Sequence, residues 1–145
     1  MEKDQIFQRL VQFLSHLEQM KDDVLQETTG KDLTNQQRDL LTILHLSGPT
    51  NLSALSRCMH MNLPNCSREV KKLAQCGYIQ KEGSPLDKRI SELSLTPSGI
   101  GVMNGIMEEM KEVYFRNAGE WDHDRAERIN TALDVLEKDL FFPGT

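Results

Sequence analysis

Hydrophobic residues near the start of the chain recur at alternating spacings of four and three positions. The series consists of Ile6, Leu10, Phe13, Leu17, Met20 and Val24. This spacing is typical of an amphipathic helix that packs along another helix. We therefore expect a long helix over residues 4–27, and Gly30 favours its end.

A second apolar segment follows a signal for the start of a helix. Thr34 and Gln37 match the pattern of a capping box, in which two side chains bond to each other's backbone amides. Four apolar residues come next: Leu40, Leu41, Ile43 and Leu44. Gly48 and Pro49 then interrupt the pattern, so we expect a mostly buried helix that ends before them.

Two short amphipathic segments follow, each preceded by a residue type that caps helices. Thr50 or Asn51 can cap the first, and Asn62 can cap the second. In the second segment Val70 and Leu73 are three positions apart, which predicts that they lie on one buried face of a helix. The segment leaves five residues largely for the outside: Asn65, Ser67, Arg68, Lys71 and Lys72. The pattern predicts two short helices joined by a tight turn, the second with a polar and basic outer face.

The segments "YIQK" and "SELSLT" predict two strands, and "EGSPLDKRI" between them predicts a loop with a basic tip. Thr96 and Pro97 then favour the start of a helix that runs to Val113. A final helix is expected over residues 122–142. It repeats the seam-like spacing at Ile129, Leu133, Leu136 and Leu140.

These elements predict a mainly α fold with a small β-hairpin wing. Two short helices followed by a hairpin form a winged helix-turn-helix, which we place at residues 31–96. Residues 1–30 and 97–145 are expected to form a helical dimerisation region, integrated with the winged region into one domain. The alternative is that the terminal helices pack on each other within a monomer.

The net charge of −5 argues against a nucleic-acid partner, but the charges are unevenly distributed. Residues 57–89 hold seven Lys and Arg against three Asp and Glu, so the rest of the chain carries −9. A basic middle on an acidic chain suggests a surface that faces a polyanion. The alternative, favoured by the overall charge, is a winged-helix module that binds proteins and no DNA.

The polar face of the second short helix has the chemistry that duplex DNA requires. Asn65 and Ser67 can approach base edges, and Arg68 can fork to guanine or to phosphate. Lys71 and Lys72 are suited to binding phosphate oxygens of the DNA backbone. At the hairpin tip, Lys88 and Arg89 extend the basic surface, and Arg89 is expected to reach the neighbouring minor groove.

The order of these elements resembles the MarR family of bacterial transcriptional regulators over nearly the whole chain. The most specific likeness is "DKRISELSLTPSG", in which Asp87, Arg89, Leu95, Thr96 and Gly99 match the wing signature of the family. Two further segments, "LTNQQRDLLTIL" and "KKLAQCGYIQK", are also similar.

The resemblance implies a homodimer whose recognition helices enter successive major grooves of a pseudo-palindromic operator. Such regulators are usually repressors that are released by a small ligand or by thiol oxidation. By position, Asp87 matches the wing acid that steadies the arginine. The chain departs from the family at Glu69, where an apolar residue is usual, and at Asn65 with Cys66, which replace a Ser/Thr-rich start.

The chain has three cysteines, Cys58, Cys66 and Cys76, with no CxxC pair and no metal-finger spacing. We expect reduced thiols and no disulfide framework. Each is a candidate redox sensor, Cys66 above all because it lies among the residues predicted to contact bases. The alternative for Cys66 is a packing role.

No catalytic, phosphate-binding or metal-ligating pattern emerges, so we expect no enzyme activity, no cofactor and no metal. The longest nearly apolar run, "LLTILHL", is far shorter than the roughly 20 residues of a membrane span. The first residues, "MEKDQIFQRL", also lack the apolar core of a signal peptide. These features indicate a cytoplasmic protein without a membrane partner.

Overall fold

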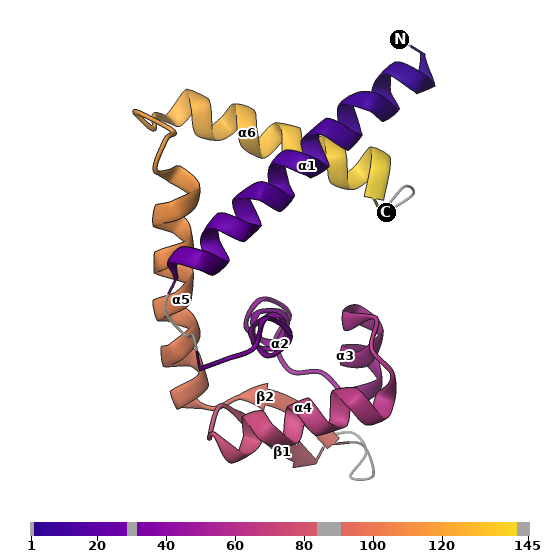
Figure 1. The fold of residues 1–145 in the computed structure, drawn as a ribbon, viewed down its shortest axis with the longest axis vertical. Helices are drawn as coiled ribbons and strands as arrows, with labels where there is room; N and C mark the ends of the chain where they lie inside the picture. The colour runs from indigo at the N-terminus through magenta and orange to yellow at the C-terminus, as the bar shows by residue number, and fades with distance from the viewer. Residues whose placement is uncertain (1, 29–31, 84–90, 142–145) are drawn as a thin grey trace. The chain divides into compact units, whose positions relative to one another are not determined.

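The computed structural model describes residues 2–28, 32–83 and 91–141, and it confirms the mainly α fold with a small hairpin (Figure 1). The elements are α1 (Lys3–Glu27), α2 (Asn35–Ser47), α3 (Leu52–Met59), α4 (Leu63–Gln75), β1 (Ile79–Gly83), β2 (Ser91–Leu95), α5 (Pro97–Phe115), α6 (His123–Leu136) and a π-helical turn η1 (Glu137–Phe141). Gly30, predicted to end the first helix, lies outside the described residues. The chain divides after Val113 into two compact units.

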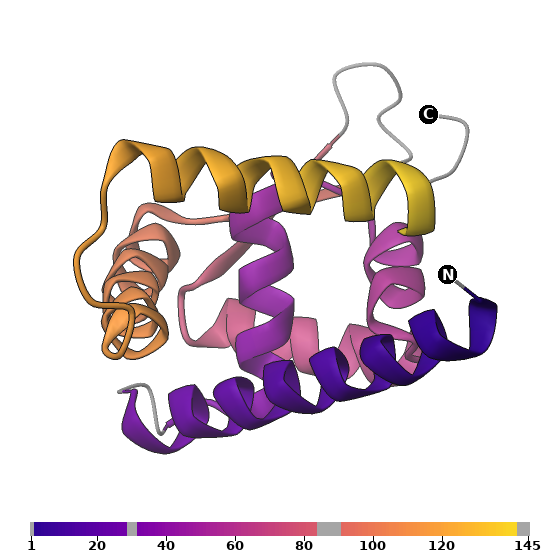
Figure 2. The same cartoon turned by 90° about the horizontal axis from the view of Figure 1, so that it is seen from above.

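The core of the first unit is built around α2. Figure 2 shows α2 in the middle of the winged helix-turn-helix, with α3 and α4 close to it. Side chains from every element of this region meet there: Leu40, Leu41, Leu44, Leu55, Cys66, Val70, Leu73, Ile79 and Leu93, with Met103 and Ile106 from α5. The predicted buried character of the second helix is therefore confirmed.

The predicted helix starts are confirmed by their hydrogen bonds. Thr34 and Gln37 form the full capping box, with the Gln37 N–H donating to Thr34 Oγ1 and the Thr34 N–H donating to Gln37 Oε1, both at 3.1 Å. Asn51 and Asn62 cap α3 and α4, and each side-chain oxygen accepts from a backbone N–H at 2.8 Å. Between these two helices, His60 adopts a left-handed conformation with φ of 52°, which makes the turn tight.

An isolated β-bridge, which the sequence pattern does not reveal, connects the hairpin to the segment between α2 and α3. Strands β1 and β2 pair antiparallel, with Ile79 opposite Leu95 and Gly83 opposite Ser91. Thr50, which we considered as a helix cap, instead pairs with Leu93 through two backbone hydrogen bonds. The connection between α2 and α3 thereby anchors the base of the wing.

The Thr-x-x-Gly sequence after the hairpin joins α5 to the end of α4. Thr96 Oγ1 donates to the Gly77 carbonyl and accepts from the Gly99 N–H, and the Thr96 N–H donates to the Tyr78 carbonyl at 3.0 Å. Gly99 packs so closely that a Cβ there would overlap the Tyr78 carbonyl oxygen. Only glycine fits where α5 meets the segment between α4 and β1.

The apolar stripe predicted on the first helix exists, but only one of its six residues is buried. Val24 is buried, whereas Ile6, Phe13 and Leu17 are each 42% exposed. At the end of α1 the buried Thr28 hydroxyl accepts from Arg38 Nη1 at 2.9 Å. The helix is thus tied to α2 at its C-terminal end, and its apolar face is open toward its N-terminus.

The described part of the second unit consists of the last residues of α5, a turn, α6 and η1. Asp122 caps α6, and its Oδ1 atom accepts from the Arg125 N–H at 2.8 Å. The rings of Phe115 and Trp121 pack edge to face with centroids 4.8 Å apart, and the Arg125 guanidinium lies over the indole. The predicted seam on α6 is also exposed, with Leu133 at 50%. No helix in the described ranges is long and apolar enough to cross a membrane.

Candidate nucleic-acid interface

Helix α4 separates its apolar and polar residues onto opposite faces. Cys66, Val70 and Leu73 recur at helical spacing and are buried in the core. The residues predicted to contact DNA stay accessible: Asn65, Arg68, Lys71 and Lys72 are exposed and Ser67 is half-buried. The structure therefore brings these five predicted residues together on one helix, which we call the recognition helix.

Two of these residues form a polar pair near the start of the helix. Arg68 Nη2 donates to Asn65 Oδ1 at 3.0 Å across one turn. This contact orients the guanidinium along the exposed face and leaves its other N–H groups able to reach outward. A guanidinium with two free donors can bind the O6 and N7 atoms of guanine or the oxygens of a phosphate.

The two lysines of the helix differ in their surroundings. Lys72 Nζ lies 3.4 Å from Glu69 Oε1, whose side chain is only 15% exposed. Lys71, one position earlier, is exposed beside this pair. A positive charge that extends into solvent is suited to a phosphate contact, which sets the register of a protein on DNA without reading sequence.

The predicted residues of the wing tip, Asp87, Lys88 and Arg89, lie outside the described residues. The strands of the hairpin are described, and a hollow beside them holds two cations, one from α3 and one from β1, that sequence reasoning did not assign to the site. Arg57 and Lys81 line this hollow of about 560 Å³ together with Asn51, Leu52, Ser53, Ser91 and Leu93. The only sequence signal for these cations was their inclusion in the basic segment.

A second feature missed by sequence reasoning connects α2 to the recognition helix. Gln37 Nε2 donates to Glu69 Oε2 at 2.9 Å. These residues are 32 positions apart, so no local pattern links them. The contact explains why an acid can occupy a place where the resemblance led us to expect an apolar side chain.

The structure corrects the interpretation of Cys66 as a redox candidate. Its side chain is fully buried within the core, so the packing alternative describes its position. An oxidant cannot reach this thiol while the protein is folded. Cys58 and Cys76 are free and exposed.

Thiol labelling is expected to distinguish the three cysteines. With an aromatic disulfide reagent, Cys58 and Cys76 should react in the folded protein, and Cys66 only after denaturant is added. In Cys66→Ala, the reaction of the folded protein should be unchanged and the denaturant-dependent reaction lost. A third thiol that reacts at the rate of the others without denaturant would contradict the buried position.

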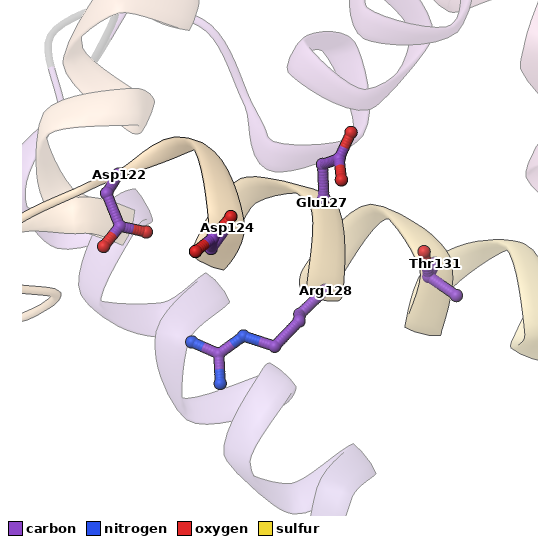
Figure 3. Close-up of a pocket in the computed structure, with 5 residues that line it drawn as sticks. All are labelled: Asp122, Asp124, Glu127, Arg128 and Thr131. Atoms are coloured by element: carbon purple, nitrogen blue, oxygen red, sulfur yellow. The ribbon is translucent and has the colours of Figure 1, made fainter.

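A hollow of about 740 Å³ lies in the second unit, along α6. It is lined by Asp122, Asp124, Glu127, Arg128 and Thr131. Figure 3 shows these side chains spread along the helix, with Glu127 and Arg128 pointing to different sides. Three carboxylates against one guanidinium disfavour an anionic ligand here. In the described part of the chain, no group of three or more His, Cys, Asp or Glu side chains is arranged to hold a metal ion.

Known proteins share both sequence and fold with this chain. Residues 33–91 match the model of the MarR family. The HTH-type transcriptional regulator YdgG of Bacillus subtilis is 32% identical over 87 residues, which cover 59% of this chain and 55% of that protein. The chain therefore matches about half the length of this curated relative.

Two solved structures extend the likeness to almost the whole chain. RV1404 from Mycobacterium tuberculosis superposes with a TM-score of 0.72 at 20% identity, covering 100% of this chain and 99% of that one. A mutant of MepR from S. aureus, bound to an oligodeoxyribonucleotide, superposes with a TM-score of 0.62 at 20% identity, covering 92% and 97%. At these identities the likeness shows a shared fold.

Proposed function

Because residues 33–91 match the model of the MarR family, we propose that this chain belongs to that family and regulates transcription by binding a pseudo-palindromic DNA operator as a homodimer. The observation that carries the proposal is the exposed face of α4, where Asn65, Arg68 and Lys71 extend from a helix whose other face is buried. A helix of this kind fits the major groove of B-DNA. The oligonucleotide bound to MepR, which shares the fold, supports the same use here.

The exposed apolar stripe of α1 supports dimerisation. Phe7 is 65% exposed and Leu14 53% exposed, beside the 42% of Ile6, Phe13 and Leu17. A large apolar surface of this kind on a soluble helix normally marks an interface, because burying it removes apolar area from water. Residues 1–30 and 97–145 supply this interface in the proposed dimer, and residues 31–96 supply the DNA-binding surface.

The finer parts of the proposal rest on the family resemblance. The protein acts in the cytoplasm as a repressor, and a small ligand or oxidation of a thiol releases it from DNA. Of the thiols, Cys58 and Cys76 are accessible to an oxidant. Arg89 inserts into the minor groove, with Lys88 beside it and Asp87 steadying it.

The experiment that tests this function is binding of the purified protein to a random-sequence duplex, followed by selection of genomic fragments. Binding to the random duplex at about 50 mM salt should weaken steeply as salt rises, because several phosphates are neutralised. The selected fragments should carry half-sites about 10 base pairs apart from centre to centre. Failure to retain any duplex at low salt would favour the alternative, a protein-interaction module.

Replacing Lys71 by alanine is expected to weaken binding to the selected operator and to the random duplex by similar factors. The slope of log affinity against log salt should become shallower by about one per subunit, because one phosphate contact is lost. Lys111→Ala serves as the control, since it removes the same charge from an exposed site on α5. If both variants changed the slope equally, Lys71 would have no specific contact with DNA.

A further inference from the structure

We propose that Gln37 and Glu69 form a polar link that sets the rotation of the recognition helix, so that its outer face meets the base edges. This inference rests on the proposed DNA-binding function and goes beyond it. It assigns a positioning role to two residues that need not touch DNA themselves. The link joins the first turn of α2 to the middle of α4.

The side-chain amide of Gln37 is held at both ends. Its Oε1 atom accepts from the Thr34 N–H at 3.1 Å, and its Nε2 atom donates to Glu69 Oε2 at 2.9 Å. The capping box therefore fixes the direction in which the amide donor points. Because the capping box of α2 holds the Gln37 amide in place, its N–H donor has a fixed position relative to α2. The Glu69 carboxylate of α4 can reach this donor only in a narrow range of helix orientations.

Glu69 is also held at both of its oxygens. Oε2 accepts from Gln37, and Oε1 lies 3.4 Å from Lys72 Nζ. The side chain is 15% exposed, so water competes only weakly for these contacts. Glu69 directly follows Arg68 and lies one turn before Lys72, so a rotation of α4 that displaced the carboxylate would displace both cations.

The contacts that the buried face of α4 makes with the core are apolar and carry less directional information. Cys66, Val70 and Leu73 pack in the core, and such contacts tolerate small rotations of a helix. A hydrogen bond to a carboxylate is short and directional, so it penalises a rotation that packing alone would permit. The link is thus suited to choosing one orientation of the helix.

A reciprocal exchange tests the link. Gln37→Glu places two carboxylates against each other and should lower affinity for the selected operator about tenfold or more, with a smaller loss on a random duplex. The double variant Gln37→Glu with Glu69→Gln has the net charge of the wild type. It restores a carboxylate-to-amide bond, and the new acid still accepts from Thr34. Its ratio of operator to random-duplex affinity should return to within about threefold of the wild type.

A single variant separates positioning from simple electrostatics. Glu69→Met keeps the volume of the side chain but removes the acceptor and a negative charge from the DNA-facing helix. Electrostatics alone would strengthen binding to every duplex. The positioning role predicts stronger binding to the random duplex and a ratio of operator to random-duplex affinity lowered about tenfold. Glu69→Met brings no two negative charges together. It therefore still tests the positioning role if repulsion between the two carboxylates prevents Gln37→Glu from folding.

The outcomes distinguish this inference from the proposed function. If the wild-type protein binds the operator but the affinity ratio is the same in all variants, or the reciprocal exchange does not restore it, the positioning role is refuted and DNA binding stands. If the wild type binds neither duplex, the proposed function itself fails and the positioning role fails with it.

Discussion

Replacing Arg68 by alanine is expected to lower the affinity of each subunit for its half-site by about 1–3 kcal/mol, or about 5- to 150-fold. The loss arises because Arg68 carries the only guanidinium on the exposed face of α4, and its contact with Asn65 holds it in an outward position. A titration of the selected operator, followed by fluorescence anisotropy at fixed salt, measures the change. Affinity for a random duplex should fall much less.

The variant Arg68→Lys is the matched control for charge. It keeps the positive charge but not the planar fork, so random-duplex binding should stay close to the wild type while operator binding falls. If Arg68→Lys bound the operator as tightly as the wild type, the guanidinium would contribute only charge. The assignment of Arg68 to base reading would then be wrong.

A valine at position 99 is expected to destabilise the fold by about 3 kcal/mol or more, the upper part of the usual range for overpacking. Its Cβ would overlap the Tyr78 carbonyl oxygen, and that backbone cannot move without disturbing the hydrogen bond from the Thr96 N–H to the same oxygen. The free energy of unfolding, measured in urea at a fixed protein concentration, gives the effect.

The control for Gly99→Val is a nearby glycine without a neighbour. Gly101 lies in the same helix, and a Cβ there would meet nothing within 4 Å. Gly101→Ala should therefore raise the free energy of unfolding by about 0.5–1 kcal/mol, because alanine restricts the unfolded chain. Equal destabilisation by the two changes would mean that loss of glycine, and not the close approach at Tyr78, is responsible.

Contacts from two neighbouring helices, one near Gly99 and one at Gln37, help to define the position of α4. Thr96 and Gly99 attach α5 to the C-terminal end of the recognition helix, and Gln37 reaches its middle from α2. The position of α4 is thus defined at two points outside its own apolar face. A change at Gly99 should affect folding as a whole, whereas a change at Gln37 should affect how DNA is read.

Local features of the chain were predictable because they depend on residues within one or two helical turns. The capping box at Thr34, the cap at Asn62 and the buried pair Val70 and Leu73 were all expected, and the structure confirms them. Each depends on a spacing of three or four residues, which the sequence displays directly. The accessible face of α4 followed from the same periodicity.

Contacts between distant segments were not predictable in this way. The burial of Cys66, four positions before Val70, agrees with the period of a helix, but nothing in the pattern paired Thr50 with Leu93. The bond between Gln37 and Glu69 was equally hidden, since 32 residues separate its partners.

The sequence by itself therefore determined the helices, their caps, the hairpin strands and the basic character of the middle segment. Only the tertiary structure decided which side chain of another helix binds the Glu69 carboxylate and how the wing is anchored at Thr50. The physical reason is that helix periodicity and capping act over a few residues. Burial and long-range hydrogen bonds depend on which surfaces meet when the elements pack.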